Sequence, residues 1–188
     1  MESLKIVAAS ILAAVGYGII HDQITARICL EYFTVLHPNI FHTNSPTLLG
    51  VGWGIYATWP VGLLLGILFA LWGRAGRRPK LVVRDLVPFL LRLLAMMAVG
   101  AAASGVLGYF FGSIPAHSYY HLILMNPTIR AGIPAIVERR FIADLWIHSA
   151  SYAIGISGGL ICCGLIFLKR RKLAQEDANS EHLVQNFA

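Results

Sequence analysis

Four long apolar stretches constrain this chain more than any other feature. They cover about residues 4–25, 47–72, 86–111 and 145–168, and each reaches the roughly 20 residues that an α-helix needs to cross a bilayer. Of the 188 residues, 57% are hydrophobic and only 13% are charged, whereas about a quarter of a soluble domain is charged. We therefore predict an all-α, polytopic membrane protein. Residues 1–172 should form a closely packed bundle of four transmembrane helices, and residues 173–188 a polar tail.

Basic residues predict how this bundle is oriented. The connection 73–85 contains five arginines or lysines and a single acid, and the tail opens with Lys169-Arg170-Arg171-Lys172. Cytoplasmic loops carry such an excess of Lys and Arg, which places both termini in the cytoplasm and the two longer connections outside. The net charge of +6 thus reflects topology. Aromatic and basic residues do not interleave as they do in RNA-binding sheets, so nucleic acid is not an expected partner.

Small residues recur at every fourth position in the last three spans. Residues four apart share one face of a helix, and small residues on that face let helix backbones approach closely. The three stripes comprise Gly50, Gly54, Thr58, Gly62 and Gly66; Gly100, Ser104, Gly108 and Gly112; and Ser151, Gly155 and Gly159. We expect these faces to pack the bundle. They also offer surfaces for a homo-oligomer or for assembly into a larger membrane complex.

Prolines predict where the helices bend, begin and end. Trp59-Pro60 lies in the middle of the second span and should kink it. The first helix can continue beyond the membrane to about Leu36, because the residue before Pro38 avoids the helical conformation. Pro115 predicts a short helix, and Pro134 starts a helix that runs into the fourth span. Helices one and four are therefore expected to extend on the outer side.

Histidines and carboxylates gather on this outer side. Near the outer end of the first helix, His21 and Asp22 are adjacent, and on the fourth helix Asp144 and His148 are four residues apart. Counting about 20 residues from the cytoplasmic end of each span brings both pairs to one depth. A third pair, again four residues apart, lies on the short helix after Pro115.

These three pairs form the candidate site, and their chemistry suits a metal. The predicted ligands are His21, Asp22, His117, His121, Asp144 and His148. Imidazoles at this spacing, supplemented by carboxylates, bind zinc, copper or iron between the helices of a bundle. The Glu-x-x-His repeats of di-iron proteins do not occur in the sequence. We assign His37 and His42 to solvated loops and expect hydrogen-bonded support for the ligands from Thr25, Tyr32 or Tyr152.

Short motifs in the first 70 residues resemble those of a group of bacterial membrane proteins of unassigned function. The motifs are His21-Asp22-Gln23-x-Thr25, Glu31-Tyr32-Phe33-Thr34 with His37-Pro38, and Gly52-Trp53-Gly54 with Ala57-Thr58-Trp59. The resemblance implies the bacterial inner membrane as the location, and it implies no activity.

The functional prediction combines these observations. We expect a multi-pass inner-membrane protein whose His/Asp cluster lies at the periplasmic face and holds a transition metal for redox or hydrolytic chemistry. One alternative is a non-catalytic structural or accessory component in which the cluster is only hydrogen-bonded. A third is a non-covalent haem b protein with His21 and His148 as axial ligands.

Overall fold

The computed structural model describes residues 1–112 and 126–186, and its regular elements in these ranges are all helices. Helix α1 (Glu2–Ile28) is followed by the π-helical turn η1 (Tyr32–Leu36). The second span consists of α2 (Pro46–Tyr56) and α3 (Trp59–Arg74), and the third is α4 (Val83–Phe111). After α6 (Pro127–Ala131) and the single turn η2 (Ala135–Val137), α7 extends over Glu138–Asn186.

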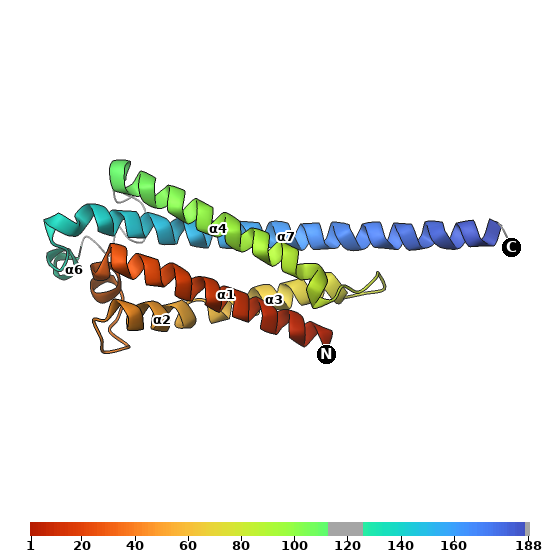
Figure 1. Ribbon diagram of the computed structural model, residues 1–188, viewed down its shortest axis with the longest axis horizontal. Coiled ribbons are helices and arrows are strands. Elements are labelled where there is room, and N and C mark those ends of the chain that lie inside the picture. Colours follow the sequence, from red (N-terminus) through yellow and green to blue (C-terminus); the bar gives the residue numbers. More distant parts are fainter. Residues whose placement is uncertain (113–125, 187–188) are drawn as a thin grey trace.

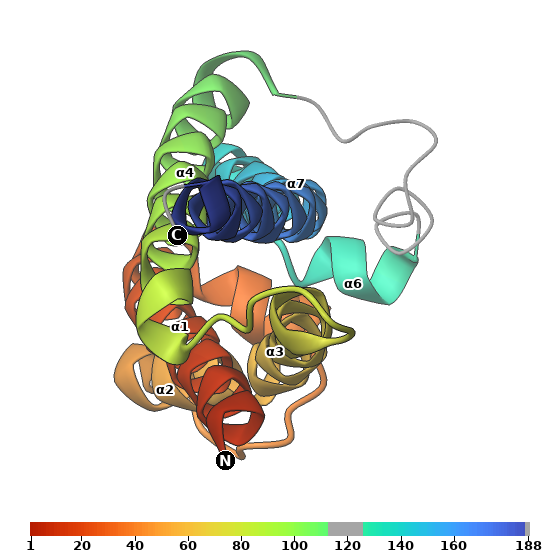
Figure 2. The ribbon, with the colours of Figure 1, turned by 90° about the vertical axis from the view of Figure 1, so that its right-hand side faces the viewer.

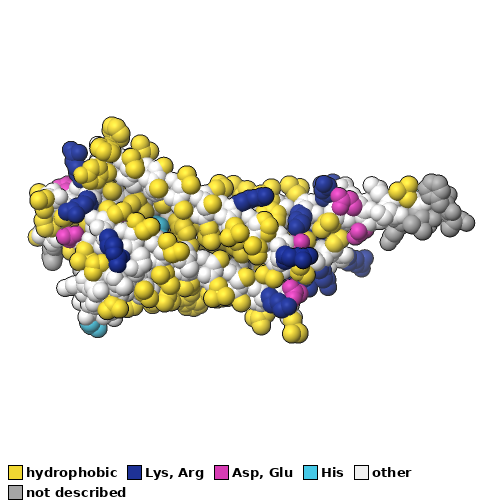
Figure 3. Space-filling view, viewed as in Figure 1, with side chains coloured by type: hydrophobic (Ala, Val, Ile, Leu, Met, Phe, Trp, Pro, Cys, Tyr) yellow, Lys and Arg dark blue, Asp and Glu magenta, His cyan; other side chains and the backbone are white. Residues whose placement is uncertain are grey.

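Four helical segments are long and apolar enough to cross a membrane. They are Glu2–Ile28, Pro46–Arg74, Val83–Phe111 and Ala135–Ser180. They coincide with the four predicted stretches, so the predicted class, an all-helical bundle with four spans, is confirmed. Figure 1 shows the spans packed together, with α7 projecting beyond the others toward the C-terminus. Hydrophobic side chains cover much of the middle of the molecule in Figure 3.

We refer to the two ends of the bundle by their residues. The basic end carries the N-terminus, the connection 75–82 between α3 and α4, and Lys169 to Lys172 of α7. The distal end is the opposite one, formed by residues 29–45 and 126–137. α7 continues as a helix through the polar segment after Lys172 as far as Asn186.

Two helix pairs make up the bundle (Figure 2). α1 packs against α2 and α3, and α4 lies along α7. The glycine stripe of the second span faces α1: a Cβ added to Gly54 would lie 2.6 Å from the backbone of Ile19. On α4, a Cβ added to Gly108 would lie 2.8 Å from Trp146 of α7. The predicted small-residue faces are therefore contact faces within the chain.

Local sequence explains the interruptions of the spans. The Ser45 hydroxyl accepts a hydrogen bond from the Leu48 backbone N–H and so caps α2, with Pro46 in the first turn. Pro60 lacks an N–H, and the second span breaks just before it, between Tyr56 and Trp59. The first helix ends earlier than predicted, because Cys29 is extended, with φ −146° and ψ 103°.

One arginine organises the basic end. The guanidinium of Arg170 donates four hydrogen bonds to backbone carbonyls, whose residues are Trp72, Ala75, Arg78 and Pro79. Its side chain is only 4% exposed. Carbonyls at the end of a helix have no intrahelical partners, so Arg170 ties the end of α3 and the following connection to α7.

The apolar interior has two parts, one toward each end. The distal part is built around Tyr32, Trp53 and Phe141, and the basic part around Phe69, Leu86 and Ile166. Buried polar side chains lie between these two parts along α1 and α7, among them Asp22, His148 and Ser151. This middle layer contains the candidate site.

Candidate functional site

Three of the predicted ligands come together where α1 meets α7. His21, Asp22 and His148 each place one nitrogen or oxygen so that the three atoms lie within 4.8 Å of one another. Asp22 and His148 are buried, at 7% and 5% exposure. The structure thus contains a compact His/Asp cluster between the first and last spans.

The other predicted residues lie elsewhere. Asp144 is one turn before His148 on α7, but its carboxyl is outside the cluster. It is fully buried, and neither carboxyl oxygen has a hydrogen-bond partner among the described residues. His117 and His121, with the short helix predicted after Pro115, fall outside the described residues.

The assignment of His37 to a solvated loop is wrong. Its ring lies 4.7 Å from that of Trp53 and 4.9 Å from that of Tyr32, measured between centroids, and its Nδ1 contacts the Tyr32 backbone oxygen at 2.9 Å. Burial lowers the pKa of His37 below its ordinary value. The turn η1 folds this residue back onto the bundle. The sequence around Pro38 did not reveal this turn. His42 is exposed, as predicted.

A chain of hydrogen bonds runs through the cluster from Tyr17. The Tyr17 hydroxyl lies 2.8 Å from Ser151 Oγ, and Ser151 Oγ lies 3.1 Å from His21 Nε2. His21 Nδ1 lies 3.0 Å from Asp22 Oδ1. An ionised carboxylate only accepts, so His21 donates from Nδ1, its Nε2 accepts from Ser151, and Ser151 accepts from Tyr17. Each side chain in this chain has a defined role as donor or acceptor.

The contact between His148 and Asp22 lacks such a donor. His148 Nδ1 lies 2.9 Å from the backbone oxygen of Asp144. A carbonyl only accepts, so this nitrogen carries a hydrogen and, in neutral imidazole, Nε2 is an acceptor. Nε2 faces Asp22 Oδ1 at 3.5 Å. Two acceptors at this distance repel each other unless a proton or a metal cation lies between them.

Aromatic rings hold His148 in place. Tyr32 stacks on it with a centroid distance of 4.3 Å and an interplanar angle of 21°. His21 meets it edge to face at 4.7 Å and 89°. A haem with two axial histidines needs the porphyrin plane between the two rings, and this close arrangement leaves no space for it. The geometry favours a single ion over haem.

Tyr17 and Ser151 are site residues that the sequence analysis missed. Tyr17 is four residues before His21, and Ser151 is three residues after His148. Both spacings place a side chain next to the histidine on the same helix face, and that signal could have identified them. Tyr32 supports the site by stacking on His148, and the Thr25 hydroxyl donates to the His21 backbone oxygen at 3.2 Å.

Two other candidates for chemistry lie away from the cluster. The Cys29 thiol donates to Glu31 Oε2 at 3.3 Å, and burial raises its pKa to about 12, so it is not a thiolate ligand at neutral pH. Gly155-Ile156-Ser157-Gly158-Gly159 has the Gly-x-Ser-x-Gly spacing of hydrolases, but it lies inside α7 instead of on a strand-to-helix turn. The hydroxyl of Ser157 is exposed and donates to the Ala153 carbonyl.

Comparison with protein-family models, with curated proteins and with solved structures returns no significant match. Functional inference for this chain therefore depends on the geometry of the cluster. That geometry consists of two imidazoles and a carboxylate, buried between two spans and linked to two hydroxyl groups.

Proposed function

We propose that this chain is a multi-pass protein of the bacterial inner membrane that binds a transition metal ion through His21, Asp22 and His148. The observation that carries the proposal is the pair of facing acceptors, Asp22 Oδ1 and His148 Nε2, 3.5 Å apart in a buried site. A divalent cation between them converts a repulsive contact into two ligand bonds.

The separations fit such an ion. Two ligand atoms at 2.0–2.2 Å from a tetrahedral zinc ion lie about 3.4 Å from each other, close to the 3.5 Å between Asp22 and His148. The hydrogen bond from His148 Nδ1 to the Asp144 backbone sets the tautomer that leaves Nε2 free, as is usual for ligating histidines. Zinc, copper and iron all accept imidazole with carboxylate ligands. Asp144, whose buried carboxyl has no hydrogen-bond partner among the described residues, is the nearby candidate for a further ligand.

The neighbouring hydroxyl groups suit proton transfer. A bound metal with an open position supplies Lewis-acid or redox chemistry. Ser151 and Tyr17 connect His21 to the surroundings of the cluster, so the Ser151 proton can pass to His21 Nε2 as the Tyr17 proton moves to Ser151. This arrangement supports hydrolytic or redox chemistry at the site.

A structural, non-catalytic role is the second candidate. The same acceptor pair is satisfied if His148 carries a second proton and forms an ion pair with Asp22. The continuous chain of hydrogen bonds from Tyr17 to Asp22 favours this reading, since it already satisfies His21 without a metal. The two functions differ in one measurable property, the metal content.

Metal analysis of the protein purified in mild detergent tests the proposal. We expect stoichiometric metal in the wild type and its loss in His148→Ala and Asp22→Asn, because each removes one ligand. The matched controls are His42→Ala and His182→Ala, which change exposed residues. If the wild type is folded but retains no metal after incubation with zinc, copper and iron salts, the cluster has the structural role instead.

The proposed topology has its own test. The excess of basic residues at the basic end supports a topology with both termini in the cytoplasm and the cluster toward the periplasm. In cells, cysteine introduced at Ala75 should be protected from a membrane-impermeant thiol reagent, whereas cysteine at Asn44 should react. The opposite labelling pattern contradicts the topology without affecting the metal site.

A further inference from the structure

An open groove runs along the bundle between α1 and α4. The two helices meet at the basic end, where the Val83 backbone N–H donates to Glu2 Oε2 at 3.5 Å, and they diverge toward the distal end (Figure 1). The groove has a volume of about 860 Å³, within the range of small-molecule pockets. On α4 its wall consists largely of small residues, such as Ala98, Ala102 and Gly105, which leave room beside the backbone.

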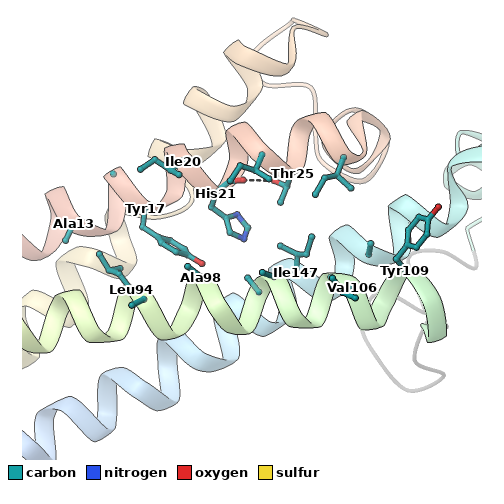
Figure 4. Close-up of a pocket in the computed structure, with 18 of the residues that line it drawn as sticks. Ala13, Tyr17, Ile20, His21, Thr25, Leu94, Ala98, Val106, Tyr109 and Ile147 are labelled. Atoms are coloured by element: carbon teal, nitrogen blue, oxygen red, sulfur yellow. Dashed lines mark hydrogen bonds between the residues drawn. The ribbon is translucent and has the colours of Figure 1, made fainter.

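The polar groups of the groove belong to the cluster. Figure 4 shows the rings of Tyr17 and His21 pointing from α1 into the space beside α4. Apart from these two, the polar side chains among the described lining residues are those of Thr25 and Tyr109. The described part of the chain contributes no Lys, Arg, Asp or Glu side chain to this wall. A molecule in the groove would therefore meet apolar surface and neutral hydrogen-bonding groups.

The apolar lining of the groove restricts the occupant further. A charged head group would need a countercharge, because an unpaired charge is costly in an apolar environment. A neutral hydroxyl group needs only one hydrogen bond, which it can donate to the Tyr17 oxygen. The Tyr17 proton is directed at Ser151, and both His21 nitrogens already have partners.

We propose that the groove binds a neutral, long-chain lipid from the bilayer, with its hydroxyl head at Tyr17, beside His21. Its apolar chain lies along the small-residue wall of α4. The lipid reaches the cluster from the side, without leaving the hydrocarbon layer. The inference rests on the proposed function, since it names the substrate class for the same site, and the site and the groove share His21.

Two glycines provide a matched test of the groove. Gly16 lines it, and a Cβ added there meets nothing within 4 Å, so Gly16→Leu narrows the groove, and its Cβ has room. Gly164 on α7 is equally open but is not part of the groove, so Gly164→Leu is the control. The full chain in phospholipid vesicles is photolabelled with a photoactivatable monoacylglycerol, and the labelled peptides are identified by mass spectrometry.

We expect wild-type labelling within residues 12–28 and 94–110. Gly16→Leu should label about tenfold less, because one leucine displaces the contacts of a chain segment of similar size. Gly164→Leu should label as the wild type does. His148 does not line the groove, so His148→Ala should lose the metal and keep the label, while Gly16→Leu should keep the metal.

Several results would overturn the inference. One is undiminished labelling of Gly16→Leu. Another is equal labelling by a second photoactivatable probe, a lysophosphatidic acid with the same acyl chain, which would show that the head group is not selected. A third is crosslinking of α1 or α4 to a second copy of the protein across the groove, which would assign the groove to an interface. Absence of metal from the wild type would overturn the proposed function and leave the lipid labelling as a separate result.

Discussion

Replacing Gly54 with alanine tests whether the contact between the first two spans depends on a missing side chain. The added Cβ would lie 2.6 Å from Cα and N of Ile19 and 2.7 Å from the carbonyl carbon of Gly18. All three are backbone atoms of α1, so no side-chain rotation relieves the overlap. Ordinary contact begins at about 3.4 Å, and the two helices must therefore separate by nearly 1 Å at this point.

The cost can be estimated against a control. Gly→Ala in a helix stabilises by roughly 0.5–1 kcal/mol when the methyl group has room. Gly164 has such room, since a Cβ there meets nothing within 4 Å. Both variants share this gain, so the difference between them is the cost of overpacking, about 1–3 kcal/mol. At roughly 2–4 °C per kcal/mol for a chain of this size, the two Tm values should differ by about 2–12 °C.

Thermal unfolding in mild detergent, followed by circular dichroism, measures this difference. Gly54→Ala should melt below Gly164→Ala, and Gly54→Leu should lower the Tm further because a larger side chain must be accommodated. If Gly54→Ala and Gly164→Ala unfold at the same temperature, α1 and α2 are not in backbone contact and the packing argument fails.

Three further predictions concern other parts of the molecule. In a variant without the other two cysteines, Cys29 should react slowly with a maleimide at pH 8, because burial raises its pKa to about 12. After unfolding in SDS it should react rapidly. Fast reaction of the folded protein would contradict the buried placement of Cys29. Burial lowers the pKa of His37 from 6.5, so the unfolded chain binds its proton more readily and stability should fall as the pH drops below about 6.5. His37→Gln should reduce that dependence. If the Tm of His37→Gln varied between pH 5 and 7 as much as that of the wild type, the prediction would be wrong. Arg170→Met removes four hydrogen bonds from a charged group and should destabilise the protein by about 3 kcal/mol or more, since each such bond contributes roughly 1.5–3 kcal/mol. Arg171→Met, at an exposed position, should have little effect on the same melt.

Helix geometry and bilayer thickness determined much of the fold from the sequence alone. Four apolar stretches of sufficient length predict four spans whatever their neighbours are, because each helix satisfies its own backbone hydrogen bonds. The same regularity places His21 and His148 at similar depths, since each residue advances a helix by a fixed 1.5 Å. The stripes through Gly54 and Gly108 predicted contact faces for the same reason.

Only the tertiary structure decided which faces meet. The sequence did not show that α1 touches α7 at the cluster. Of the four candidate ligands that the structure describes, three come together. Asp144 shares a helix face with His148, but its carboxyl is not among the three groups that come together in the cluster. Ser151 and Tyr17 acquire their roles only through contact across the two spans.

The ends of the helices and the groove also depended on long-range packing. Nothing local in Cys29 requires an extended backbone; the break lets Tyr32 stack on His148, a residue more than a hundred positions away. The groove between α1 and α4 exists because these helices converge at one end and diverge at the other. Crossing angles result from many small contacts summed along each interface, and the local pattern of one helix does not reveal that sum. Periodicity along one helix is a local property that can be counted, whereas the pairing of helices is a property of the whole chain.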